Sequence, residues 1–74
     1  MDLILYGEKG LIAIEVKNSD QIRTDDLKGL KLFGLDYPQT QLIFIYRGKK
    51  TEKRENILCV PAEDFFSNSA IKYI

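Results

Sequence analysis

Apolar residues gather in short segments of this 74-residue chain, and the spacing within each segment predicts a strand. Residues 2–6 and 11–17 are apolar runs on either side of the sequence GEKG, whose two glycines predict a tight hairpin turn. Residues 41–46, QLIFIY, form a nearly continuous apolar run that is typical of a strand buried on both faces. Residues 57–60, ILCV, predict one more strand.

Between the second and third of these predicted strands, the apolar residues recur at the spacing of a helix. Leu27, Leu30 and Phe33 recur at helical spacing, and Thr24 is suited to cap the helix that they predict. The pair Tyr37–Pro38 predicts its end, because the residue before proline is pushed out of the α conformation. A helix between two strands favours a crossover to a parallel neighbour.

The remaining segments complete the expected organisation. Pro61 can occupy the first turn of a short second helix, while residues 47–56, RGKKTEKREN, are expected to form a charged loop. The order is then β-β-α-β-β-α, an α/β fold with one small mixed sheet. We expect a single domain over residues 1–74, with a core at about 2–66 and a weakly patterned tail at 67–74.

Composition narrows the functional classes. The chain has no histidine, which excludes Ser-His and Cys-His catalysis and histidine-ligated metal sites within it. Its formal net charge is zero, so overall charge favours neither nucleic acid nor a membrane surface. The single Cys59 cannot form an internal disulfide, and no apolar run approaches the roughly 18 residues of a membrane helix. We therefore expect a cytoplasmic protein without a membrane segment.

The hairpin turn predicts which residues face each other. If GEKG closes the hairpin symmetrically, Ile4 faces Ala13 and Asp2 faces Glu15. Lys17 falls on the same face as Glu15, because side chains alternate along a strand. The opposite face is entirely apolar and is expected to be the core side: Leu3, Leu5, Ile12, Ile14 and Val16.

Two facing carboxylates predict a site for positive charge. Facing Cβ atoms lie about 4.5–5.5 Å apart, where like charges destabilise a strand pair. A hard cation such as Mg²⁺ between Asp2 and Glu15 would remove that repulsion, and so would Lys17. With Mg²⁺ the three residues suit phosphodiester hydrolysis, in which the metal activates water and the lysine stabilises developing negative charge. The alternative is a solvated acid–lysine pair on an exposed strand.

An acid, a short hairpin and Glu-x-Lys resemble the motif of the PD-(D/E)xK nuclease superfamily, carried here by Asp2, Glu15 and Lys17. The sequences IAIEVKNSDQIRTDDLKGLKLFGLDYPQTQLIFIYRG and ILCVPAEDFF also resemble the C-terminal domain of a prokaryotic, archaeal-type AAA+ ATPase family. The resemblance extends from Asp2 to about Phe66. It implies a restriction-endonuclease-like core with catalytic roles for these three residues.

Compared with these families, the chain is expected to be truncated at its N-terminus. In the nuclease superfamily a helix and a strand precede the hairpin acid, whereas Asp2 is the second residue here. The motif G-x-x-x-x-G-K-[ST] does not occur, so no nucleotide site is expected. A missing strand exposes a sheet edge and a missing helix exposes an apolar patch. We therefore expect a homodimer, or a partner that covers the open edge.

Two further groups of polar residues are candidates for the site. Ser19 and Gln21 follow Lys17, and in relatives of the superfamily polar groups here can line the active site. The alternative is a turn into the helix whose side chains bond the local backbone. The charged loop is a candidate phosphate-binding segment or simply a solvated loop, and its basic residues are Arg47, Lys49, Lys50, Lys53 and Arg54.

Three functions remain open. The first is a nuclease-like domain with a Mg²⁺-dependent site at Asp2, Glu15 and Lys17, weak or inactive in a truncated chain. The second is a non-enzymatic interaction or oligomerisation module derived from the C-terminal domain of an ATPase. The third is a domain that binds nucleic acid through the basic loop without cleaving it.

Overall fold

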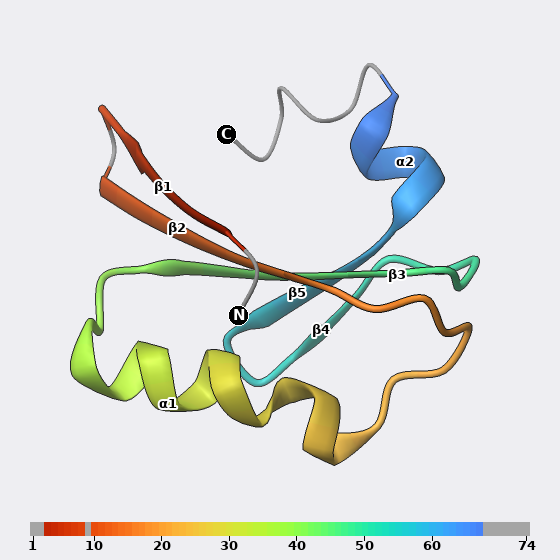
Figure 1. The fold of residues 1–74 in the computed structure, drawn as a ribbon, viewed down its shortest axis with the longest axis horizontal. Coiled ribbons are helices and arrows are strands. Elements are labelled where there is room, and N and C mark those ends of the chain that lie inside the picture. The colour runs from red at the N-terminus through yellow and green to blue at the C-terminus, as the bar shows by residue number, and fades with distance from the viewer. Residues whose placement is uncertain (1–2, 9, 68–74) are drawn as a thin grey trace.

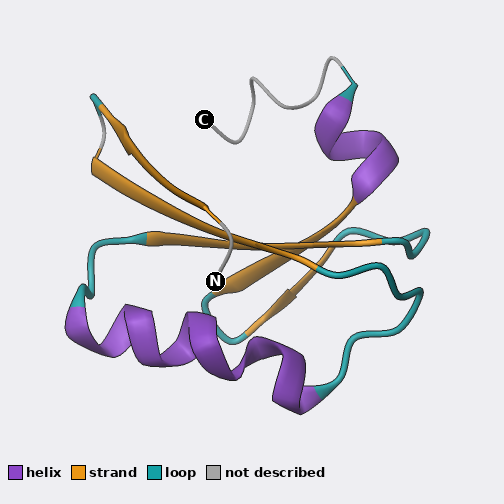
Figure 2. Ribbon diagram, in the orientation of Figure 1, coloured by secondary structure: helices purple, strands orange, loops and turns teal. Residues whose placement is uncertain are grey.

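The computed structural model describes residues 3–8 and 10–67, which form a mixed five-stranded sheet with helices on its two faces (Figure 1). In space the strands follow the order β1-β2-β3-β5-β4. Figure 2 distinguishes the strands from the helices and loops. Along the chain the elements are β1 (Leu3–Gly7), β2 (Gly10–Val16), the 3-10 helix η1 (Thr24–Leu27), α1 (Lys28–Asp36), β3 (Gln41–Tyr46), β4 (Glu52–Arg54), β5 (Ile57–Pro61) and α2 (Ala62–Phe66).

Strands β1 and β2 form the predicted hairpin in the predicted register. Ile4 lies opposite Ala13 and Tyr6 lies opposite Leu11. Gly10 begins β2 with a φ of 116°, a conformation that side chains with a Cβ rarely adopt. The glycine at the end of the turn therefore allows the tight reversal that sets the register.

Helix α1 makes the predicted crossover, since β2 and β3 pair in parallel on either side of it in sequence. It ends at Asp36 as expected, and the N–H of Tyr37 donates a 2.9 Å hydrogen bond to the carbonyl of Phe33. The start differs from the prediction. The N–H of Arg23 donates to the Asp26 carboxylate at 3.3 Å, so Arg23 is the capping residue and Thr24 is already inside η1.

Helix α1 covers one face of the sheet. Its Leu30 is fully buried against a cluster that includes Ala13 of β2 and Phe44 of β3. Gly34 permits the close approach of α1 to β3, because a Cβ at this position would stand 2.9 Å from Cδ1 of Leu42. The face of β2 that carries Ala13 and Glu15 is therefore part of the core.

Helix α2 covers the other face, where Phe65 packs with Ile12 and Ile14. This is the face that the sequence predicts to be buried, so the core under α1 corrects the expectation that only one face of the hairpin is buried. Leu3 and Val16 were expected in the core but are 48% and 43% exposed. The reason is the position of α2, which packs against β3 and β5 near the middle of the sheet.

The expected loop at 47–56 contains an additional strand. Residues Glu52–Arg54 form β4, which pairs antiparallel with β5 and makes the second edge of the sheet. The described order is thus β-β-η-α-β-β-β-α rather than β-β-α-β-β-α. All three residues of β4 are charged and exposed, so backbone pairing with β5 defines this strand rather than side-chain burial.

Candidate functional site

Glu15 lies near the end of β2, beside Phe44 of β3 in the parallel ladder. Its side chain is half-buried on the α1 face. Its Oε1 atom lies 3.9 Å from the point where a Cβ on Gly29 would stand, which places the carboxylate at the first turn of α1. The predicted acid is therefore held between the sheet and the helix.

The predicted partner of Glu15 lies outside the described residues. Within the described residues the observed register begins at the pair Leu3 and Ile14, in agreement with the predicted pairing. Asp2 itself is not described, so the expected pairing of its carboxylate with Glu15 stays a prediction. Within residues 3–8 and 10–67, no group of three or more cysteine, aspartate or glutamate side chains is placed to hold a metal ion. Of the two predicted carboxylate ligands, Glu15 is thus the one that the structure describes.

Lys17 is placed differently from Glu15. It follows the last residue of β2, and its N–H donates a 2.9 Å hydrogen bond to the carbonyl of Ile45. It lines an open cleft of about 470 Å³ where β2 and β3 end and α2 begins. We call this the strand-end cleft, and its lining consists of Val16, Lys17, Asn18, Arg47, Gly48, Lys49, Ala62 and Glu63. Glu15 is not among the lining residues.

Arg47 connects two segments of the strand-end cleft by hydrogen bonds. Its Nη1 atom donates a 3.1 Å hydrogen bond to Oδ1 of Asn18, across 29 positions of sequence. Its backbone N–H donates to the carbonyl of Ser19 at 2.8 Å. These two bonds join the segment after β2 to the segment after β3.

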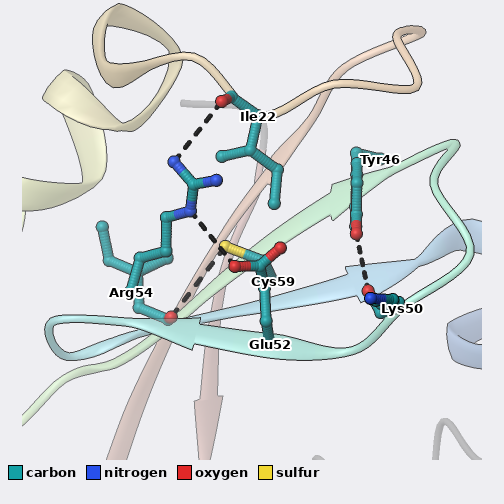
Figure 3. A network of polar contacts seen from close by, with 7 residues as sticks. Ile22, Tyr46, Lys50, Glu52, Arg54 and Cys59 are labelled. Atoms are coloured by element: carbon teal, nitrogen blue, oxygen red, sulfur yellow. Dashed lines mark hydrogen bonds and ion pairs between the residues drawn. The ribbon is translucent and has the colours of Figure 1, made fainter.

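The five basic residues predicted as one loop separate in the structure. Arg47 and Lys49 line the strand-end cleft, whereas Lys53 and Arg54 belong to β4 at the sheet edge. The carbonyl of Lys50 accepts a hydrogen bond from Tyr46, as Figure 3 shows. Arg54 contacts Oε2 of Glu52 at 3.3 Å and the carbonyl of Ile22 at 3.4 Å, also in Figure 3.

Ser19 and Gln21 make the local contacts that the turn interpretation predicts. The Ser19 hydroxyl donates to the carbonyl of Gln21 and accepts from its N–H, both at 3.3 Å. Neither residue is part of the strand-end cleft lining.

Sequence reasoning missed the grouping of Lys17 with Asn18, Arg47 and Glu63. A usable signal was present, because the carboxyl ends of parallel strands meet at one edge of a sheet. The predicted crossover makes β2 and β3 parallel. Residues directly after both strands should therefore lie together, including Lys17 and Arg47.

Two residues of the core under α1, Tyr46 and Cys59, have side chains with altered acidity. Burial raises the pKa of the Cys59 thiol, and the nearby Glu52 carboxylate adds to the increase while Arg54 opposes it. Burial likewise raises the pKa of the Tyr46 hydroxyl. A thiol that resists ionisation is a poor nucleophile, so Cys59 serves the core.

Comparison with known proteins identifies a family for this chain. No curated protein and no solved structure matches it. Within the described residues, no helix is long and apolar enough to cross a membrane. The family described as "Domain of unknown function (DUF4143)" matches residues 1–65, and the chain therefore belongs to this family.

Proposed function

We propose that the domain is a non-enzymatic interaction module that associates with a second copy of itself through the open edge of β1. The observation that carries the proposal is the side-chain composition of this edge. Three of its residues expose large apolar side chains, with Leu3 at 48%, Ile4 at 42% and Tyr6 at 86%. The opposite edge, β4, consists of charged residues alone. Charges are a usual protection of a sheet edge, and within residues 3–7 the strand β1 has none.

A second copy suits this edge. An antiparallel pair of β1 strands related by a two-fold axis at Leu5 places Ile4 of each copy opposite Tyr6 of the other. Aromatic and β-branched side chains form favourable cross-strand pairs, worth about 0.2–1 kcal/mol each. The formal net charge of zero also removes overall repulsion between copies.

The test compares two substitutions of similarly exposed apolar residues. We expect sedimentation equilibrium to show a concentration-dependent dimer that Tyr6→Lys shifts toward monomer. Leu35→Lys, on α1 and 76% exposed against 86% for Tyr6, is the matched control and should leave the dimer intact. A monomeric wild type at millimolar concentration, or equal loss in both variants, would contradict the proposal.

A Mg²⁺-dependent phosphodiester site is a second candidate, supported by the hairpin register, in which Leu3 pairs with Ile14 as the sequence predicts. In this nuclease-like interpretation Asp2 and Glu15 hold the metal and Lys17 stabilises negative charge on the phosphate. A bound Mg²⁺ would supply an activated water molecule. The side chain of Glu15 is half-buried, which suits Mg²⁺ because this cation usually keeps several bound water molecules.

A metal titration tests this second candidate. Mg²⁺ and then Mn²⁺ are added while backbone amide shifts are recorded by NMR, and Glu15→Gln should abolish shifts that centre on the hairpin. Glu8→Gln removes an exposed acid from the turn of the same hairpin and serves as the control. Unchanged shifts at millimolar metal would exclude the site.

A further inference from the structure

The strand-end cleft occupies a position where open α/β sheets commonly bind ligands. The parallel strands β2, β3 and β5 all end at the same edge of the sheet. From β2 the chain turns toward α1 on one face, and from β5 it turns into α2 on the opposite face (Figure 1). A crevice outside the carboxyl ends of parallel strands, where connections leave to opposite faces, is a general location for binding sites.

The cleft is positively charged although the chain as a whole is neutral. Its lining includes the cations Lys17, Arg47 and Lys49 and the single carboxylate of Glu63. Ion pairs within the described ranges instead join Lys31 to Glu55 and Arg54 to Glu52. The local excess of two positive charges favours a doubly charged anion.

The exposed side chain of Arg47 already has a protein partner in the cleft. Its Nη1 donates a hydrogen bond to Asn18 that orients the guanidinium, and the remaining N–H groups of its planar fork can reach a second acceptor. Such a fork matches the geometry of phosphate oxygens, and ordering it in advance lowers the entropy cost of binding. Lys17 and Lys49 are exposed and can follow the ligand as flexible point charges.

We propose that the strand-end cleft binds a small phosphorylated molecule through Arg47, Lys17 and Lys49, without a metal ion. The cleft volume of about 470 Å³ is within the roughly 300–1,000 Å³ of small-molecule sites. A nucleic-acid interface would need a basic stripe that continues beyond the cleft. Beyond the cleft the exposed Lys50 follows in the loop, and the basic residues after it belong to β4, where Arg54 is already paired with Glu52. The proposal is independent of the dimer, and it shares Lys17 but neither carboxylate with the Mg²⁺ site.

An NMR titration with pyrophosphate tests the proposal. The probe is added in EDTA at constant ionic strength, with sodium chloride as the comparison salt. We expect saturable shifts at the amides of residues 17–18 and 47–49. Arg47→Gln should weaken binding about tenfold, since a hydrogen bond to a charged group contributes on the order of 1.5 kcal/mol. Lys53→Gln removes the same charge from β4 and is the matched control, whereas Glu63→Gln should tighten binding.

Several results would overturn the proposal. One is the absence of saturable shifts at millimolar pyrophosphate, and another is an equal response to chloride. A third is equal weakening by Arg47→Gln and Lys53→Gln. If a single-stranded oligonucleotide binds while pyrophosphate does not, and shifts β4 as strongly as the cleft, the surface is a nucleic-acid interface instead. Lys49→Gln provides a second cleft variant if Arg47→Gln disturbs the fold, which its amide spectrum would reveal.

Discussion

The hydroxyl of Tyr46 donates a 2.6 Å hydrogen bond to the backbone carbonyl of Lys50, four residues later (Figure 3). This bond closes the loop that leaves β3 at the strand-end cleft. The ring is buried and packs beside Phe44 at a centroid distance of 6.1 Å. One tyrosine thus links the core under α1 to the loop that contains Arg47 and Lys49.

Removing this hydroxyl should loosen the loop. We expect Tyr46→Phe to lower the free energy of unfolding by about 1 kcal/mol, because the net contribution of a typical hydrogen bond is of this size. Urea denaturation followed by circular dichroism measures the change. Tyr37→Phe, at a residue that is 51% exposed, is the control and should have little effect. Equal stability of wild type and Tyr46→Phe would show that the bond contributes nothing.

Gly48 makes the position of that ring possible. A Cβ at Gly48 would overlap the ring atoms Cε2 and Cζ of Tyr46, so any larger residue must displace the tyrosine. We expect Gly48→Ala to cost about 1–3 kcal/mol, the usual range for overpacking a buried contact. Thermal unfolding and the amide shifts of residues 47–51 measure the effect. A crystal structure of the variant with Tyr46 in place would contradict this account.

The hairpin and its register could be predicted because a local signal specifies them. Glycines bracket the turn, and the side-chain alternation on either side agrees with only one pairing. The central strand β3 was equally predictable, since its uninterrupted apolar run requires burial on both faces.

The strand β4 and the core under α1 could not be predicted in the same way. Glu52, Lys53 and Arg54 have no apolar alternation, and they form a strand only because β5 offers unpaired backbone groups. In β2, Ala13 shares a face with the charged Glu15 and Lys17, and these charges indicate a face exposed to solvent. In the structure α1 covers that face at Ala13. Both features depend on tertiary contacts that sequence periodicity does not contain.

For the candidate site, the sequence identified side chains but not their grouping. It placed Glu15 and Lys17 together because both lie on one face of an ideal strand. In the structure β2 ends at Val16, and Lys17 lines the strand-end cleft with Arg47 instead. Alternation predicts neighbours only as far as the strand continues.

The two glycines of α1 should respond in opposite directions to alanine. At Gly29 the nearest atom to a new Cβ is Oε1 of Glu15 at 3.9 Å, an ordinary contact, so Gly29→Ala should gain up to about 1 kcal/mol of helix propensity. At Gly34 the new Cβ would stand 2.9 Å from Cδ1 of the buried Leu42. Overpacking of about 1–3 kcal/mol then exceeds the gain, so Gly34→Ala should be less stable than wild type. Urea denaturation of both variants measures the pair, and a stabilising Gly34→Ala would mean that the packing of α1 on β3 is loose.

Stability should decline at alkaline pH because of Cys59. Burial raises the pKa of this thiol, so the folded chain retains a proton that the unfolded chain releases. The contribution is complete below the unfolded thiol pKa of about 8.5 and is lost as the pH rises through the folded pKa. Tyr46 acts in the same direction from about pH 10 upward, since burial raises its pKa as well. Urea unfolding at about pH 7.5 and pH 9.5 should show a smaller loss of stability for Cys59→Ala than for wild type, even though the cavity makes the variant less stable at the lower pH. Parallel losses in the two proteins would assign the alkaline decline to other groups.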